Sequence, residues 1–299
     1  MKPKQFNKRA AFTIVELLTV MSIIVILIGL LVPALNQVKR YAYEVKQRAQ
    51  LKSIDTAIEL FNSEFDGYPD SSRMGPDGVE YCGAMKLCEA VMGQDLLGYH
   101  PDSTFRADGT NGTVSLYPNS SSVTPAQYRD NLATRKGPYL PLDNANAFSM
   151  EDLYGTTDPF LPRHFVLCDV YKRVTHKKIG SKVGMPILYY RANTANSMHD
   201  VDNFDNPLNI YNYRDNQTLI SLGKPWDPAN VGNQGTPGSG AHALRNPKRF
   251  YMNTRNHKVL VTSRPHLANT YILISAGWDG EYGTPDDICN FEWKYLEMP

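Results

Sequence analysis

The sequence has almost no excess of charge of either sign. Its 299 residues include 31 Lys and Arg against 30 Asp and Glu, a formal net charge of +1. Proteins that bind nucleic acid usually carry a clear basic excess, so the composition argues against a nucleic-acid partner. The charges are unevenly distributed at the N-terminus. Residues 1–11 contain no acid and four basic residues, Lys2, Lys4, Lys8 and Arg9.

Cysteine is scarce. The four cysteines are too few for a small disulfide scaffold and form no C-x-x-C pair: Cys82, Cys88, Cys168 and Cys289. In an exported domain an even number permits two bridges, whose pairing the spacing does not give. Buried free thiols are the equal alternative.

Sequence motifs of catalysis are absent. The chain has no G-x-S-x-G, no Walker A loop and no H-E-x-x-H, and its seven histidines are scattered. The acid pairs of glycoside hydrolases meet only in space, so they leave no such motif. We therefore do not expect an enzyme. There is no internal repeat either.

The most distinctive feature is a long uncharged run from Leu17 to Leu35. A helix over this run, at about 1.5 Å per residue, is about 28 Å long, which nearly matches a ~30 Å hydrocarbon core. The basic leader before it should stay cytoplasmic and the bulk of the chain should face outward. A cleaved secretory signal is the competing interpretation, but its apolar region is usually only ~7–15 residues long and ends in a small-residue site.

Glu16 is out of place at the edge of this run. A charged side chain costs roughly 2.5–3.5 kcal/mol at the bilayer centre and less near the interface. Glu16 either sits at the level of the cytoplasmic headgroups or has a positive partner inside an assembly.

The pattern of residues 8–18, KRAAFTIVELL, resembles the processing signal of type IV pilins and type II secretion pseudopilins. The resemblance implies cleavage between Ala11, where the family usually has Gly, and Phe12, which becomes N-methylated. It also implies that Glu16 pairs with the Phe12 amine of a neighbouring subunit, a charge pair that fixes register. Pro33 lies where family members commonly carry a helix-kinking proline.

The resemblance also implies a place and partners. The chain would span the bacterial inner membrane once, with its N-terminus cytoplasmic and its head periplasmic, and would later enter a filament in the cell envelope. Its partners would be other pilin-like subunits, a prepilin peptidase, and an inner-membrane assembly platform with its ATPase. The expected fold is α+β, a long membrane-spanning helix packed on a head with a small antiparallel sheet and large loop insertions.

The expected organisation has four parts: a leader (1–11), a helix (12–66), a head (67–265) and a C-terminal strand with an acidic loop (266–299). Within the helix, residues 12–35 are transmembrane and 36–66 amphipathic, since apolar residues recur there at three- and four-residue steps. The other predicted elements are a helix at 84–97, loops at 101–130 and 192–246, and strands at 165–174, 186–191, 258–262 and 270–275. Clustered Tyr and Asn within 189–213 suit a half-buried sheet or a binding surface, and we favour the sheet.

Four acids fall close together within residues 275–288, SAGWDGEYGTPDDI, after the last predicted strand. Calcium prefers six to eight oxygen ligands, which an acidic loop with tight turns can supply. A solvated hairpin end is the alternative. The loop is similar to the calcium loop of major pseudopilins, and this likeness implies structural calcium held by Asp279 and Asp287, with Asp286 as a third ligand.

We therefore expect a structural filament subunit. A pseudopilin is favoured over a surface pilin because of the acidic loop and because the C-terminal disulfide loop common in surface pilins is missing. The large head also suits a minor or specialised subunit. The alternative is a membrane-tethered extracytoplasmic protein that binds polysaccharide and uses the helix only as an anchor; such a protein should tolerate Glu16→Leu.

Overall fold

The computed structural model describes residues 13–155, 160–161, 164–196, 198–200, 202–226, 242–259 and 263–296. The predicted processing residues Ala11 and Phe12 lie outside this set. The chain divides into two compact units, Met1–Tyr43 and Glu44–Pro299, and each is described here by itself.

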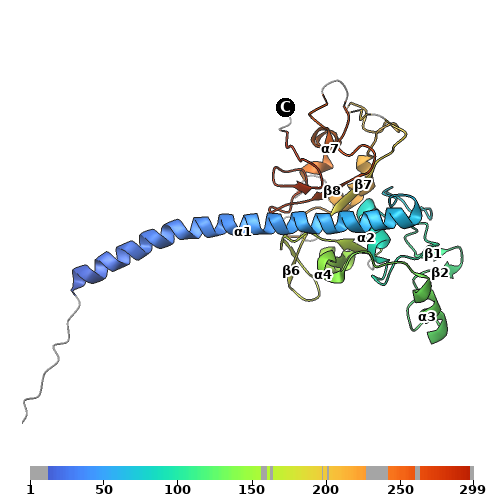
Figure 1. The fold of residues 1–299 in the computed structure, drawn as a ribbon, viewed down its shortest axis with the longest axis horizontal. Helices are drawn as coiled ribbons and strands as arrows, with labels where there is room; N and C mark the ends of the chain where they lie inside the picture. The colour runs from blue at the N-terminus through green and yellow to red at the C-terminus, as the bar shows by residue number, and fades with distance from the viewer. Residues whose placement is uncertain are drawn as a thin grey trace, which may run out of the picture. The chain divides into compact units, whose positions relative to one another are not determined.

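Helix α1 runs without interruption from Ile14 to Phe65 and contains Pro33 (Figure 1). The long helix that the sequence predicts is therefore confirmed. It ends close to the predicted boundary at residue 66, because Asp66 adopts a left-handed conformation with φ of 52° and Gly67 follows.

Within the second unit, α1 buries one stripe against the head. The stripe consists of Gln47, Gln50, Leu51, Ile54, Ala57, Ile58 and Phe61. Val45 and Ala49 belong to the apolar pattern of the predicted amphipathic stretch 36–66, but both are exposed, and two glutamines are buried in the stripe. Gln47 Oε1 accepts a hydrogen bond from the Val170 N–H (2.9 Å), and Gln50 Nε2 donates to the Cys168 carbonyl (2.9 Å). Amide side chains are buried here because they satisfy backbone groups of the head.

Helix α2 (Gly83–Met92) forms the centre of the head, and all 10 of its residues are buried. It contacts strands β4 (Phe165–Leu167) and β7 (Leu188–Arg191). The helix is shorter than the predicted 84–97, because Gly93 adopts a φ of 86° and the chain turns away.

A three-stranded antiparallel sheet in the order β7-β8-β9 confirms the small sheet that the sequence predicts. It joins β7 to β8 (Tyr271–Ser275) with Leu188 opposite Ile274, and β8 to β9 (Ile288–Cys289). The predicted strand 165–174 is two separate strands, β4 and β5 (Val174–Thr175). Lys258 and Val259 of another predicted strand are not extended in a sheet, and residues 260–262 lie outside the described set.

The remaining elements are short. The strands are β1 (Thr110–Asn111), β2 (Val114–Ser115), β3 (Ala147–Ser149), β5 (Val174–Thr175) and β6 (Lys182–Val183). They pair as β1-β2, β3-β4 and β5-β6, all antiparallel. The helices are α3 (Pro125–Thr134), α4 (Leu142–Ala145), α5 (Met150–Tyr154), α6 (Gln217–Ser221) and α7 (Pro247–Thr254), with 3₁₀ turns η1 (Tyr213–Asn216) and η3 (Ala243–Arg245).

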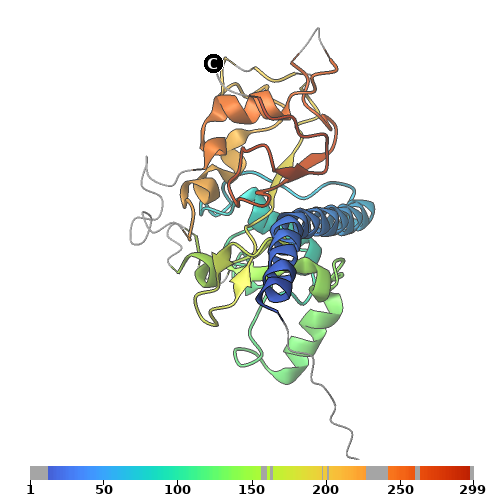
Figure 2. The same ribbon diagram turned by 90° about the vertical axis from the view of Figure 1, so that its left-hand side faces the viewer.

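The head packs on both sides of the second half of α1. Helix α7 and strands β7 and β8 lie on one side, and α4 and β6 lie on the other, as the two ribbon views agree (Figures 1 and 2). Contacts reach α1 from both groups: Gln50 Nε2 donates to the Asn144 carbonyl (3.2 Å), and the Tyr271 hydroxyl donates to Asp55 Oδ1 (3.1 Å). The described part of the chain thus has an α+β architecture.

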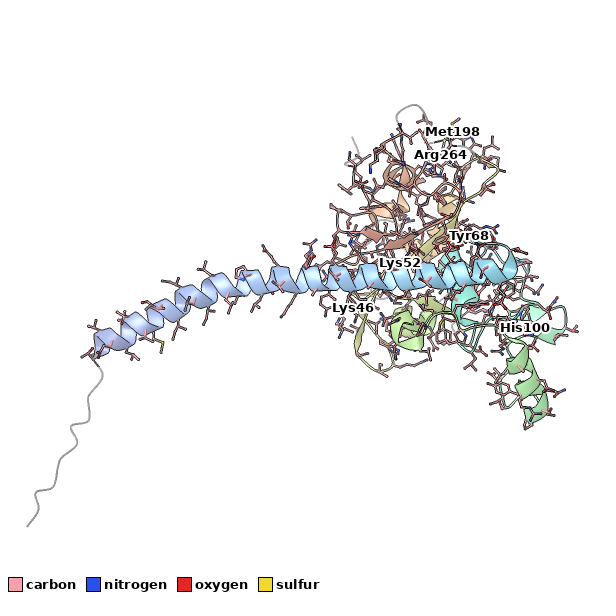
Figure 3. The ribbon with its side chains drawn as sticks, viewed as in Figure 1. Lys46, Lys52, Tyr68, His100, Met198 and Arg264 are labelled. Atoms are coloured by element: carbon pink, nitrogen blue, oxygen red, sulfur yellow. The ribbon has the colours of Figure 1, made fainter. Side chains whose placement is uncertain are left out.

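One sequence expectation about the head needs correction. The predicted loop at 192–246 is not only a surface insertion, since Ile210, Tyr211, Leu219 and Ile220 belong to the main core. Figure 3 shows one of its exposed residues, Met198, beside Arg264 at the end of the head that holds α7. The segments that contain these two residues are joined by a hydrogen bond from the His199 N–H to the Ser263 carbonyl (2.8 Å). All four cysteines are buried free thiols, which is one of the two alternatives that the sequence left open.

Candidate functional site

The first half of α1 is apolar and uncovered. Every residue from Ile14 to Ala42 is exposed. One 18-residue window has a mean hydropathy of 2.8 with none of it buried, which makes α1 the only helix among the described residues long and apolar enough to cross a membrane. A contiguous apolar surface of this length is unfavourable in water, so it requires a lipid or protein environment.

Two hydroxyl side chains within this apolar stretch are satisfied by the helix itself. The Thr19 hydroxyl donates to the Glu16 carbonyl (3.0 Å), and the Ser22 hydroxyl donates to the Thr19 carbonyl (2.8 Å). Because a bilayer core offers no water to satisfy polar groups, such internal bonds make these residues acceptable in a spanning helix.

Glu16 closes the start of the helix together with Thr13. Glu16 Oε2 accepts hydrogen bonds from the Thr13 N–H (2.9 Å) and the Thr13 hydroxyl (2.8 Å), and Thr13 Oγ1 accepts from the Glu16 N–H (3.2 Å). This reciprocal pattern is a capping box, and a carboxylate in the first turn is also favoured by the helix dipole. Thr13 is not among the site residues predicted from the sequence, although Thr-x-x-Glu before an apolar run is a recognised signal for this cap.

The cap uses only part of the Glu16 carboxylate. Within the described residues, Glu16 Oε1 accepts no hydrogen bond, and Glu16 has no ion-pair partner. The side chain is exposed. Glu16 therefore has a local structural role and leaves one carboxylate oxygen and its charge exposed.

Pro33 lies inside the continuous helix, one turn after Gly29. Proline has no N–H, so the Gly29 carbonyl loses its usual i+4 donor. A Cβ added at Gly29 would meet nothing within 4 Å in the chain, so packing does not impose this glycine. The pair is a local weak point in the backbone hydrogen bonding of the apolar segment.

The acidic loop connects β8 to β9 and folds on itself. The Asp279 N–H donates to Asp286 Oδ2 (3.0 Å), and Asp279 Oδ1 accepts from the Glu281 N–H (2.7 Å). Gly277 permits the close approach: it has a φ of 65°, and a Cβ there would lie 2.1 Å from the Asp286 carbonyl oxygen. The two ends of the loop are thereby held against each other.

Asp287 organises the end of the loop. Its Oδ2 accepts from the Gly283 N–H (2.7 Å) and its Oδ1 from the Thr284 N–H (3.3 Å), while the Trp293 indole donates to the Thr284 carbonyl (2.8 Å). Asp287 is only 6% exposed and the neighbouring Tyr282 is fully buried. The loop is therefore a packed element, and the alternative of a solvated hairpin end is wrong.

Residues from elsewhere in the head anchor the loop. The Arg173 guanidinium donates to the Trp278 carbonyl (2.7 Å), and the buried His242 accepts from the Tyr282 N–H (3.2 Å). Lys224 forms an ion pair with Glu281. None of these partners follows a pattern in the sequence, because each comes from a distant segment.

The loop carries the carboxylate oxygens that a calcium site needs, but these oxygens do not point toward one common position. Burial, followed by the nearby charge of Asp286, raises the pKa of Asp279 to about 6, and burial also raises the pKa of Asp287. However, no three Asp, Glu, His or Cys side chains among the described residues are grouped so as to hold a metal ion. The loop's own N–H groups already use oxygens of all three predicted ligands, so calcium at Asp279, Asp286 and Asp287 stays a prediction.

Two buried histidines, His199 and His242, have structural roles in the head. His199 Nε2 accepts from the Tyr211 N–H (3.0 Å), and burial lowers the pKa of His199 and of His242 to about 3. Both are neutral at physiological pH and bonded to backbone groups. They are not assembled into a nucleophile–base pair.

No protein-family model, no curated protein and no solved structure matches this chain.

Proposed function

We propose that this chain is a structural subunit of a type IV pilin-like filament, of the kind found in type II secretion pseudopili. A prepilin peptidase would cleave it between Ala11 and Phe12, and α1 would hold it in the bacterial inner membrane with the head in the periplasm. The observation that carries the proposal is the first half of α1, which is fully exposed, apolar, and opened by a carboxylate in its first turn.

The exposed apolar surface supports both stages of such a life cycle. Before assembly, lipid chains cover it. In a filament, the same helices cover one another after the assembly platform and its ATPase extract each subunit. Because apolar burial is non-directional, lipid and neighbouring helices are interchangeable as cover, and the exchange needs no change in the fold of the head.

Glu16 supplies the directional part of the contact. An uncompensated carboxylate is unfavourable among apolar helices, so packing is favoured only where a cation meets it. The N-methylated amine of Phe12 in a neighbouring subunit is such a cation, and Glu16 Oε1 is the oxygen that the cap leaves available. The weak point at Gly29 and Pro33 would let the apolar segment adapt when subunits pack.

The first experiment determines the mature N-terminus. The full chain is co-expressed with a prepilin peptidase and analysed by mass spectrometry, with a control prepilin that shows the peptidase to be active. A terminus at N-methylated Phe12 supports the proposal. An intact Met1, or cleavage after the apolar run, refutes it and favours a tethered or secreted binding protein.

The second experiment separates the charge of Glu16 from its cap. In Glu16→Gln the amide oxygen can still accept from the Thr13 N–H, since Gln also serves in capping boxes, but the charge is gone. Glu16→Leu removes both. Glu44→Gln is the matched control on the same helix, because its ion pair with Arg48 is exposed and such pairs contribute about 0–1 kcal/mol.

Filament assembly is measured by shearing cells that also express the assembly machinery, and insertion is checked by carbonate extraction of membranes. We expect Glu16→Gln and Glu16→Leu to insert and to lose assembly, and Glu44→Gln to assemble. Normal assembly of Glu16→Gln would show that the cap suffices and that charge pairing is wrong. Normal assembly of Glu16→Leu would favour the simple membrane anchor.

A further inference from the structure

The head contains a polar cavity of about 580 Å³, a volume typical of ligand sites. Three separate chain segments line it: residues 70–72 after α1, residues 191–194 at the end of β7, and residues 204–215 leading into η1. Tyr251 of α7 contributes a fourth wall. The cavity lies entirely within the second unit.

One wall of the cavity is fixed by buried polar contacts. Ser71 Oγ accepts from the Arg191 N–H (3.0 Å) and donates to Asp215 Oδ2 (2.5 Å). Asp215 is 5% exposed and Ser71 is 3% exposed. Next to them the fully buried Lys86 donates to Asp70 Oδ2 (2.5 Å). Groups that are locked in this way are pre-organised, so a ligand would lose little free energy in ordering them.

Other lining groups remain available to a ligand. Within the part of the chain that the structure describes, the Arg191 guanidinium and the Thr194 hydroxyl make no hydrogen bond, and both residues are exposed. The same holds for the Nδ2 amides of Asn193 and Asn212, whose Oδ1 atoms accept from backbone N–H groups. The cavity therefore offers several free donors beside the carboxylate oxygens of Asp70 and Asp205.

An aromatic wall adds an apolar face. The half-buried ring of Phe204 stacks on Tyr251, with centroids 6.2 Å apart and planes 9° from parallel. The Tyr251 hydroxyl is held by the Phe204 and Tyr211 carbonyls (both 3.2 Å). A flat aromatic surface beside clustered donors and acceptors suits a ring with one apolar face and hydroxyl groups at its edge.

The carboxylates of the cavity are mostly paired within the protein. Asp70 is paired with Lys86 (2.5 Å) and Asp205 with Arg214 (2.7 Å). A charged ligand would therefore gain little here, because an anion would meet Arg191 together with the oxygens of these carboxylates, and a cation would be repelled by Arg191. A neutral ligand whose hydroxyl groups both donate and accept hydrogen bonds can use these donors and acceptors without a charge of its own.

The sheet edge at the cavity is not open to an added peptide strand. β7 is an edge strand, but its Arg191 N–H is bonded to Ser71 Oγ, and its Tyr189 carbonyl accepts from Asn216 Nδ2 (2.7 Å). Strand addition needs free backbone groups along such an edge. Side-chain recognition of a compact polar ligand fits this cavity better.

We propose that this cavity binds a neutral saccharide, with Arg191, Asn193 and Asn212 bonding its hydroxyl groups and Phe204 stacking on a ring. The inference goes beyond the filament proposal and does not depend on it. A processed, assembling subunit can fail to bind saccharide, and a chain that never assembles can bind it.

The test uses the full-length chain in lauryldimethylamine oxide, a detergent without a sugar headgroup. Saturation-transfer NMR is recorded with cellohexaose, xylohexaose, mannohexaose, laminarihexaose and chitohexaose, and the affinity for any binder is measured by calorimetry. Arg191→Ala should bind about tenfold more weakly, the loss expected for one hydrogen bond from a charged donor. Arg129→Ala is the control, because Arg129 lies on α3 outside the cavity with its side chain 81% exposed.

Arg191→Gln distinguishes a hydrogen-bonding role from a charge effect. With a neutral saccharide this variant should keep part of the affinity, and added salt should change little. Absence of binding to every oligosaccharide, or equal binding by wild type and Arg191→Ala, overturns the proposal. Salt-sensitive binding of polygalacturonate and inorganic polyphosphate alike, without binding of the neutral sugars, also overturns it in favour of a general anion site.

Discussion

Asp215 should make the stability of the head fall as the pH rises. Its side chain is almost fully buried, and among the described residues Ser71 is the one donor to its carboxyl group. Burial, together with the nearby charge of Asp70, raises its pKa to about 8, against about 3.9 in an unfolded chain. Between these values the folded state holds a proton that the unfolded state has lost.

The sign and size follow from this difference. A raised pKa gives stability that is complete below about pH 4 and is lost as the pH rises toward 8. Each pH unit in this window contributes about 1.4 kcal/mol, so Asp215 should cost about 3 kcal/mol between pH 5 and pH 7.5. Asn at this position has no such titration and can still accept from the Ser71 hydroxyl.

The assay compares melting temperatures of wild type, Asp215→Asn and the control Asp130→Asn from pH 5 to pH 7.5. Asp130 is a suitable control because its side chain is 76% exposed. In a domain of this size 1 kcal/mol shifts the melting temperature by about 2–4 °C, so Asp215→Asn should gain about 6–12 °C on wild type across the range. A constant difference between Asp215→Asn and wild type would refute the assignment of a buried, protonated acid.

Three further predictions concern the loop and the helix. At a concentration 100 times its Kd, calcium, but not magnesium, should raise the melting temperature at pH 7.5 by about 5–10 °C. The increase should be smaller at pH 5, where protons compete for Asp279. No shift in wild type, or an equal shift in Asp279→Asn, would contradict the calcium prediction. Gly277→Ala should lower the free energy of unfolding of the head, measured in urea, by at least about 2 kcal/mol. Gly112→Ala is the control and should lower it less, because Gly112 has a similar φ but no atom within 4 Å of an added Cβ. Equal decreases for the two variants would exclude the steric argument. Gln50→Ala should cost about 2 kcal/mol, because it leaves the Cys168 and Asn144 carbonyls without this donor, and a loss below about 0.5 kcal/mol would show that water replaces it.

The features that depend on local pattern could be predicted from the sequence. An uncharged run long enough for a bilayer, a turn signal at Asp66 and Gly67, and apolar strand segments before residues 191 and 275 correctly predicted α1, its end, β7 and β8. These elements follow from hydrophobicity and backbone preference over neighbouring residues. The Thr13–Glu16 cap also follows from local sequence, because Thr-x-x-Glu before an apolar run predicts it.

Which polar groups are buried, and which of them contact one another, depends on contacts between distant segments. Gln47 and Gln50 are buried in the α1 stripe, and Val45 and Ala49 are not, because the two glutamines form hydrogen bonds with backbone groups of Val170 and Cys168. The acidic loop is packed because Arg173, Lys224 and His242 reach it from other segments, and the cavity exists because residues 70–72, 191–194 and 204–215 meet. Such contacts have no period in the sequence, since chain topology and the satisfaction of buried polar groups select them.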